Sequence, residues 1–142
     1  MVSRMPAWFT FALITLLLWG LWGIFPKLAT NHIDPRSVLV FEGIGRFVVT
    51  LVVLAMIGFR PEMKVEGVSY AVLGGLIGSI GAVFFFYAVS QGKASVVVTT
   101  TALYPLITIL VSYPLLGEEP SARQGLGMVF AMIALVLFSV EA

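Results

Sequence analysis

The chain has 142 residues, of which 60% are hydrophobic and only 11% are charged, and its mean hydropathy is +1.08. Soluble domains usually carry about 25% charged residues, so this chain has too little polar surface to cover a water-soluble globule. The net charge of +1 gives no excess of basic residues that would bind nucleic acid. The lack of cysteine excludes thiol chemistry and disulfides.

Long uncharged runs indicate that the chain crosses a bilayer about five times as α-helices. A span needs roughly 20 apolar residues, because the hydrocarbon core is about 30 Å thick and a helix rises about 1.5 Å per residue. Helices are favoured because lipid offers no partner for an unpaired backbone group, and a β-barrel would need alternating polarity. We predict an all-α, polytopic transmembrane helix bundle that occupies 1–142 as one domain. Its helices are expected at approximately 7–28, 37–59, 67–90, 94–116 and 121–140.

The first predicted helix carries three tryptophans and ends at a proline and a lysine. Its uncharged run between Arg4 and Lys27 is longer than the core of a signal peptide, so we interpret it as a retained helix. Trp19 lies deep enough in this helix to form the wall of a cavity. Lys27 either lines a substrate path together with Trp19 or extends its ammonium group to the lipid headgroups.

The second predicted helix spans the bilayer only if it takes Glu42 and Arg46 into the membrane. Arg46 then lies roughly 14 Å into the helix, close to the midplane. Ionisable residues at this depth are expensive and mark either a functional site or a contact inside the bundle. The i, i+4 spacing suits an intrahelical ion pair. Two interpretations stay open: a pair that fixes packing, or an Arg46 that binds an anionic group while Glu42 carries a proton or cation.

The third predicted helix is rich in small residues. Gly74, Gly78 and Gly81 would let neighbouring helices approach closely, so we predict a helix-packing role for them. Their spacing does not indicate a phosphate loop, because they lie within an apolar span that no strand precedes.

The fourth predicted helix has Pro105 almost at its centre. A proline there frees the carbonyl of Thr101 and kinks the helix. A freed carbonyl, the hydroxyl of Thr101 and the neighbouring Tyr104 together resemble the way transporters build a substrate site at the midplane. The alternative is a tolerated kink whose carbonyl is satisfied by a threonine side chain.

An enzyme is not supported by this inventory of side chains. The single histidine, His32, and the single aspartate, Asp34, both fall in a predicted loop. No His/Cys pattern has the spacing of a metal site, and no nucleophile and base occur together within the spans. We therefore predict no catalytic residue, no metal and no cofactor.

The basic residues that flank the spans are almost evenly divided between the two sides of the membrane. One side would carry Arg4, Arg60, Lys64 and Arg123, and the other Lys27, Arg36 and Lys93. Lys and Arg normally concentrate on the cytoplasmic side. This weak bias leaves two interpretations: a single orientation with the first side cytoplasmic, or insertion in both orientations.

An ordered set of motifs gives the sequence a family resemblance. The set consists of Trp19-Gly20, Lys27, Pro35, Arg46, Phe86-Tyr87-Ala88, Gln91-Gly92-Lys93-Ala94-Ser95, Ala102-Leu103-Tyr104-Pro105-Leu106, Leu116-Gly117-Glu118, Ser121, Gln124 and Gly127. On these residues the chain resembles a single EamA domain of the drug/metabolite transporter superfamily over nearly its whole length. Ala134 departs from the pattern where a glycine is common, and Glu42 is not part of it.

The resemblance implies a multi-pass transporter of small metabolites in the cell membrane, usually built from two five-helix halves in inverted orientation. This chain would supply one half, and one half cannot enclose a pathway between inverted repeats. We therefore expect a dimer, either a homodimer whose subunits can be antiparallel or a pair with a second half-size subunit.

The resulting hypothesis is a secondary transporter, more specifically an exporter, of a small organic metabolite or drug-like solute that works by alternating access. Its substrate path is expected to contain Trp19, Lys27, Arg46, Thr101, Tyr104 and Pro105, and Glu42 is the candidate for proton or ion coupling. A membrane scaffold or assembly subunit that transports nothing, and a channel, are the alternatives.

Overall fold

The computed structural model describes residues 6–139, with side chains as far as Leu137. Within this range all regular secondary structure is helical, which confirms the all-α prediction. The chain divides into two compact units, with the boundary between Ser90 and Gln91. Each unit is described by itself.

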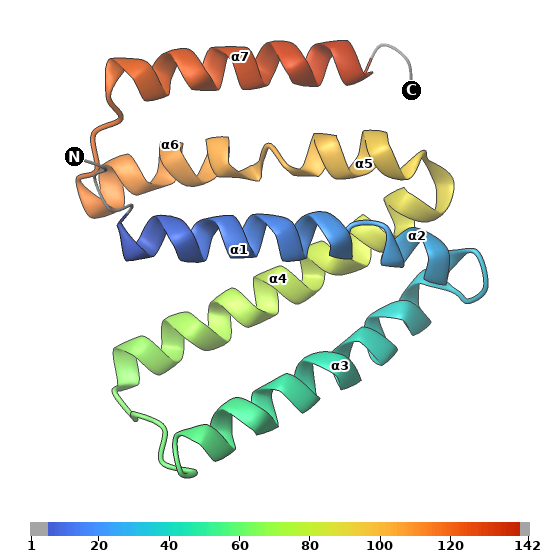
Figure 1. Cartoon of the computed structure of the whole chain (residues 1–142), viewed down its shortest axis with the longest axis vertical. Helices are drawn as coiled ribbons and strands as arrows, with labels where there is room; N and C mark the ends of the chain where they lie inside the picture. Colours follow the sequence, from blue (N-terminus) through green and yellow to red (C-terminus); the bar gives the residue numbers. More distant parts are fainter. Residues whose placement is uncertain (1–5, 140–142) are drawn as a thin grey trace. The chain divides into compact units, whose positions relative to one another are not determined.

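The first unit contains α1 (Ala7–Trp22), α2 (Phe25–Thr30), α3 (Pro35–Met56) and α4 (Val65–Gln91), which run from blue to yellow-green in Figure 1. The second unit contains the remaining helices, α5 (Ala94–Thr101), α6 (Tyr104–Leu116) and α7 (Ala122–Ser139).

Four helical segments are long and apolar enough to cross a membrane: Ala7–Thr30, Pro35–Met56, Val65–Gln91 and Ala94–Leu116. Helix α7 is also apolar, and its described part has 18 residues, or about 27 Å of rise. Over residues 6–139 the structure therefore supports a polytopic membrane protein with four full-length candidate spans, and the predicted fifth span at 121–140 extends beyond the described residues.

The first span contains a break that the predicted continuous helix 7–28 did not include. Helix α1 ends at Trp22 and α2 begins at Phe25. Pro26 explains the break, because it has no N–H to donate to the carbonyl of Trp22 and its ring crowds that carbonyl. The helical pattern resumes at once, since the N–H of Leu28 donates to the carbonyl of Ile24 at 3.1 Å.

Helix α3 begins at a well-formed cap. The Asp34 side chain accepts a hydrogen bond from the backbone N–H of Arg36 at 2.9 Å and another from the Arg36 guanidinium at 3.0 Å. These bonds, the side-chain bond first, hold the pKa of the Asp34 carboxyl below its usual value. At its other end α3 gives way to Gly58 and Phe59, whose φ angles of 64° and 58° turn the chain out of the helix.

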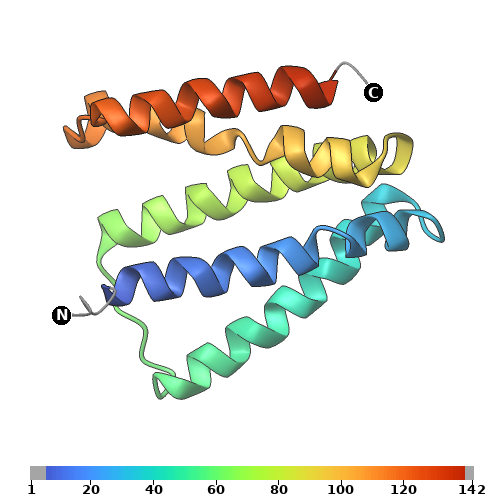
Figure 2. The same ribbon diagram turned by 45° about the horizontal axis from the view of Figure 1, so that its top comes forward.

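The best-packed part of the first unit lies at the carboxyl end of α4. Phe86 and Val89 are fully buried there, and Val38 of α3 is also buried. The ring of Phe85 stacks on Trp22 with centroids 5.3 Å apart. In two views α2 lies close to the start of α3 and the end of α4 (Figures 1 and 2).

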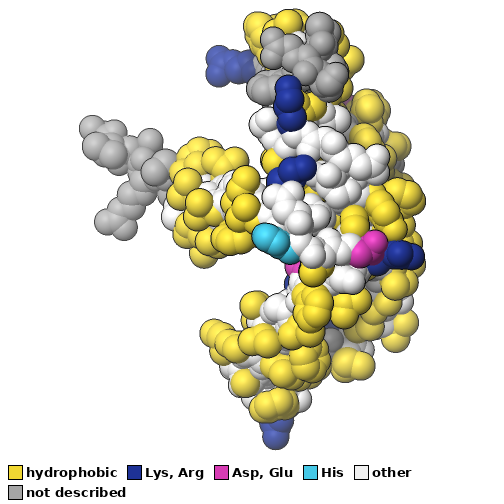
Figure 3. Space-filling model, turned by 90° about the vertical axis from the view of Figure 1, so that its right-hand side faces the viewer, with side chains coloured by type: hydrophobic (Ala, Val, Ile, Leu, Met, Phe, Trp, Pro, Cys, Tyr) yellow, Lys and Arg dark blue, Asp and Glu magenta, His cyan; other side chains and the backbone are white. Residues whose placement is uncertain are grey.

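Large apolar side chains remain exposed along the rest of α1, α3 and α4. Figure 3 shows hydrophobic side chains over much of the face in view. A soluble domain would bury such side chains in a core, whereas lipid solvates them, so this exposure agrees with membrane insertion.

In the second unit the fourth predicted helix is broken, as its proline indicated. Helix α5 ends at Thr101 and α6 begins at Tyr104, with Pro105 in the first turn of α6. The Thr101 hydroxyl donates to the carbonyls of Val97 at 2.9 Å and Val98 at 3.1 Å. The hydroxyl therefore bonds within its own helix, at the point where α5 ends.

Helix α7 begins at a reciprocal capping arrangement. The Ser121 hydroxyl accepts from the backbone N–H of Gln124 at 3.3 Å, and the Gln124 carboxamide oxygen accepts from the backbone N–H of Ser121 at 2.7 Å. This capping box satisfies N–H groups that have no partner within the helix. Helix α7 packs against α5 in the same unit.

Candidate functional site

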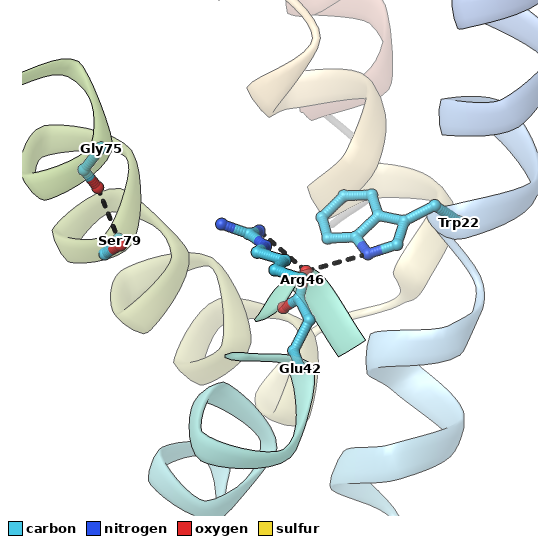
Figure 4. A network of polar contacts seen from close by, with 5 residues as sticks. All are labelled: Trp22, Glu42, Arg46, Gly75 and Ser79. Carbon is cyan, nitrogen blue, oxygen red and sulfur yellow. Dashed lines mark hydrogen bonds and ion pairs between the residues drawn. The ribbon is translucent and has the colours of Figure 1, made fainter. Parts of the chain in front are cut away.

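Two hydrogen-bond donors converge on one oxygen of Glu42 in the first unit. The Arg46 guanidinium donates from Nη2 to Oε1 at 2.8 Å, and the Trp22 indole donates from Nε1 to the same oxygen at 3.2 Å. Figure 4 shows these three side chains meeting between α1 and α3. The i, i+4 ion pair predicted from the sequence is therefore present, with an additional donor.

The local fold explains why these groups meet. Glu42 and Arg46 lie one turn apart on α3, and Arg46 is 11 residues after Pro35 in a helix of 22 residues. This places Arg46 about 16 Å along the axis, in the central part of the span. Trp22 is the last residue of α1, and its ring is held by the stack on Phe85 of α4.

The second oxygen of Glu42 has no hydrogen-bond partner among the described residues and is buried. The Glu42 side chain is 20% exposed, whereas that of Arg46 is 55% exposed. An unsatisfied buried acceptor costs about 1–3 kcal/mol, and more if it is charged. One oxygen of the carboxylate therefore accepts two hydrogen bonds, and the other accepts none from the described residues.

A cleft of about 160 Å³ lies beside this carboxylate. Its lining consists of Leu39, Glu42, Gly43, Arg46 and Ser79. The Ser79 hydroxyl donates to the carbonyl of Gly75 within α4 at 2.8 Å (Figure 4). The cleft thus combines an apolar wall with one ion pair and one hydroxyl.

The part of the ion pair that is open to a bound molecule is the Arg46 guanidinium, which is 55% exposed, and a guanidinium carries five N–H donors in all. The Oε2 atom of Glu42 is buried. The described residues contain no group of three or more His, Cys, Asp or Glu side chains that could hold a metal ion.

The other two predicted path residues of the first unit lie apart from this lining. Trp19 lies in α1, one turn before Trp22, and its side chain is exposed. Lys27 donates from Nζ to the carbonyl of Val89 at 2.9 Å and to that of Ser90 at 3.5 Å. These carbonyls lie in the last turn of α4, so Lys27 satisfies groups that the helix leaves without partners.

The predicted residues Thr101, Tyr104 and Pro105 all lie in the second unit, at the break between α5 and α6. The Tyr104 side chain is exposed. The structure thus brings these three together with one another. Their role in a substrate path remains a prediction.

The glycines for which we predicted packing have open space around them. A Cβ atom added at Gly74, Gly78 or Gly81 would meet no atom within 4 Å. Their close approach to another helix therefore stays a prediction.

Sequence reasoning missed Trp22 and Ser79 as parts of the site. Trp22 carries a weak signal, because a tryptophan inside a span needs a partner for its N–H and Pro26 interrupts the helix four residues later. Ser79 carries no such signal, since a serine in a glycine-rich helix usually indicates packing.

Comparisons with known proteins place the chain in a family. It is 25% identical over 129 residues to an uncharacterized protein of Methanocaldococcus jannaschii, and the match covers 91% of this chain and 93% of that protein. No solved structure matches the chain. The EamA-like transporter family matches residues 6–140, which includes every helix described above. The chain therefore belongs to the EamA-like transporter family and is a multi-pass integral membrane protein.

Proposed function

We propose that the protein is a secondary transporter that exports a small organic metabolite or drug-like solute across the cell membrane by alternating access. The observation that carries this proposal is the ion pair of Glu42 and Arg46 beside a cleft, in the central part of a candidate span. Ionisable groups at membrane depth mark solute and ion pathways.

In this proposal Arg46 and Glu42 contact the solute, and Glu42 is also the group that couples transport to a proton or cation. Trp19, Lys27, Thr101, Tyr104 and Pro105 complete the path. Lys27 would act indirectly, because its bonds to the end of α4 tie the broken first span to the helix that carries Ser79.

The working unit in this proposal is a dimer, either of two copies of this chain or with a second half-size subunit. The support is the M. jannaschii relative, because the match covers 93% of that protein as well as 91% of this chain. The open surface around Gly74, Gly78 and Gly81 would permit close approach of a partner helix. The nearly even division of basic flanking residues is compatible with an antiparallel pair.

The proposal is tested by solute flux into and out of proteoliposomes, with a broad panel of small metabolites. We expect saturable flux that is lost in Glu42→Gln and Arg46→Gln. The matched control is Glu62→Gln with Lys64→Gln, an exposed ion pair of 3.6 Å outside the spans, which should leave flux unchanged.

Three outcomes would contradict the proposal. Conductance that does not saturate would indicate a channel. Loss of partner capture in Glu42→Gln, without flux in any variant, would indicate a scaffold or assembly subunit. Flux that Glu42→Gln and Arg46→Gln leave intact would remove this pair from the path.

A further inference from the structure

We propose that α1 is a hinged arm of the first unit, and that the hydrogen bond from Trp22 to Glu42 is the latch that holds the arm in place. The latch opens when Glu42 loses its negative charge. The inference concerns motion within the chain, so it goes beyond the proposed solute path. It follows from three features of the unit: a packed base that anchors α2, a break between α1 and α2, and the contacts of Trp22 at the end of α1.

The base of the hinge is the packed region formed by α2, the start of α3 and the end of α4. Pro26 and Val38 are buried there, and Phe86 and Val89 are fully buried. Lys27 donates from Nζ to the carbonyl of Val89 at 2.9 Å, which ties α2 to α4. Because close packing and a charged hydrogen bond act together, we expect α2 to move with this region as one body.

The hinge is the break between α1 and α2 (Figure 1). Pro26 has no N–H, so the carbonyl of Trp22 lacks the donor that a continuous helix would give it. The N–H of Ile24 donates to the carbonyl of Leu21 at 3.5 Å, which is long for a hydrogen bond. Hinges of this kind need changes in the backbone angles of only a few residues at the end of an element.

Helix α1 is the arm. Its residues Ala7–Leu21 are exposed, and none of them is charged. Helices in lipid are held together by packing and hydrogen bonds, so a helix with little packing is free to turn at a hinge. The Thr15 hydroxyl bonds within α1, and Trp8 contacts its neighbour Phe9. Among the described residues of α1, only Trp22 makes a hydrogen bond or a ring stack to another helix.

The Trp22 indole holds the arm against both neighbouring helices. Its Nε1 donates to Oε1 of Glu42 on α3 at 3.2 Å (Figure 4), and its ring stacks on Phe85 of α4. A bond to a carboxylate is charge-assisted and roughly twice as strong as a bond between neutral groups. The same oxygen accepts from Arg46 at 2.8 Å. Loss of the carboxylate charge therefore weakens the bond from the arm and the bond from Arg46 together.

Arg46 is the charged group that faces this carboxylate. Helix α1 carries no charged residue, and the only one in α4 is Glu66, in its first turn. The other charged residue of α3 is Arg36, whose ion pair lies at the start of the helix. A change of charge at Glu42 is thus felt by Arg46 on the same helix and by the Trp22 N–H on the arm, which links the position of α1 to that charge.

The experiment measures distances between pairs of spin labels by double electron–electron resonance, with the full-length protein in lipid nanodiscs. The chain has no cysteine, so two introduced cysteines are the only labelling sites. Phe11→Cys with Tyr70→Cys reports the position of α1 against α4. Leu28→Cys with Tyr70→Cys reports α2 against α4 and shows whether the base stays intact. All three native side chains are exposed.

We expect one distance between the labels at 11 and 70 in the protein with an intact latch, and a second, displaced population in Glu42→Gln and in Trp22→Phe. Phe11 lies 11 residues before Trp22, or about 16 Å along the axis. A swing of about 20°, the size of a sharp helix kink, would move it by about 6 Å. Combining the two changes should displace α1 no further than either change alone, because both open the same latch.

Two matched controls change the same residue types away from the latch. Glu62→Gln neutralises an exposed carboxylate outside the spans, and Trp8→Phe alters an exposed tryptophan at the far end of α1. Both should keep the single distance between the labels at 11 and 70. A displaced population in these controls would show that the motion does not depend on the latch and would overturn the inference.

A distance between the labels at 11 and 70 that Glu42→Gln or Trp22→Phe leaves unaltered would also overturn the inference, as would displacements that add in the combined variant. An equal change between the labels at 28 and 70 would do the same, because the base would then move with α1. Motion of α1 without flux of any solute would leave the hinge standing and contradict the transport function. Flux that depends on Glu42 without motion of α1 would do the reverse.

Discussion

The Nζ atom of Lys27 lies 2.9 Å from the carbonyl oxygen of Val89 and joins the short helix α2 to the end of α4. The two residues are 62 positions apart in the sequence. The ammonium group sits where a helix leaves carbonyls without partners, and a positive charge also complements the negative end of the helix dipole. This contact fixes the second part of the broken first span against the best-packed region of the unit.

Replacing Lys27 by Met should therefore destabilise the protein. The change removes a charged donor from the carbonyl of Val89, at a cost of about 2 kcal/mol. Lys27→Arg, which keeps a donor and a charge, should lose less. Chemical unfolding in detergent micelles measures the difference. Lys64→Met is the control, because the Lys64 side chain is 85% exposed and its ion pair is with the exposed Glu62. Equal stability of Lys27→Met and Lys64→Met would contradict the structural role.

Trp22 should be coupled energetically to Glu42. Trp22→Phe keeps an aromatic ring against Phe85 but removes the N–H, whereas Trp22→Leu removes both. We expect the free energy of unfolding to fall in that order, with the loss of the aromatic pair adding about 0.5–1.5 kcal/mol. A double-mutant cycle of Trp22→Phe and Glu42→Gln should give an interaction energy of about 0.5–3 kcal/mol. Additive effects would show that the 3.2 Å contact carries no energy.

The extent to which the sequence predicted this structure depends on how local each signal is. Pro105 acts on its own helix, so the break between α5 and α6 could be predicted from position alone. The pair of Glu42 and Arg46 could be predicted for the same reason, because one turn of helix brings them together. The family motif residues Ser121 and Gln124 are also explained locally, by the capping box of α7.

Contacts between helices were beyond such reasoning. Trp22 reaches Glu42 across 20 residues and Lys27 reaches Val89 across 62, and no periodicity in an apolar sequence specifies such pairs. In a membrane chain most spans are hydrophobic on all sides, so the pattern that identifies the buried face of a soluble helix is absent. The break at Pro26 was missed because a proline near the end of a span is compatible with either a bend or a terminus.

Replacing Pro105 by Ala should join α5 and α6 into one helix. Alanine restores an N–H that can donate to the carbonyl of Thr101 and removes the ring that crowds it. We expect slower amide hydrogen exchange at residues 102–104 and reduced solute flux, because the proposed path depends on the break. Pro114→Ala, which changes a proline inside α6, is the matched control and should leave exchange at residues 102–104 unaltered. Unchanged exchange in Pro105→Ala would show that other forces maintain the break.

Asp34 should make stability depend on pH in a narrow acid range. Because hydrogen bonds from Arg36 lower the pKa of the folded carboxyl, the charged form is favoured in the folded state. The resulting stabilisation is fully present above the usual pKa of 3.8 and is lost as the pH falls through the lower folded pKa. Asp34→Asn keeps a capping oxygen but does not titrate, so its stability should change less over this range, whereas Asp34→Ala should be less stable at every pH. Thermal unfolding in detergent at a series of acidic pH values measures all three. Parallel pH profiles for the unaltered protein and Asp34→Asn would show that the cap contributes through its geometry alone.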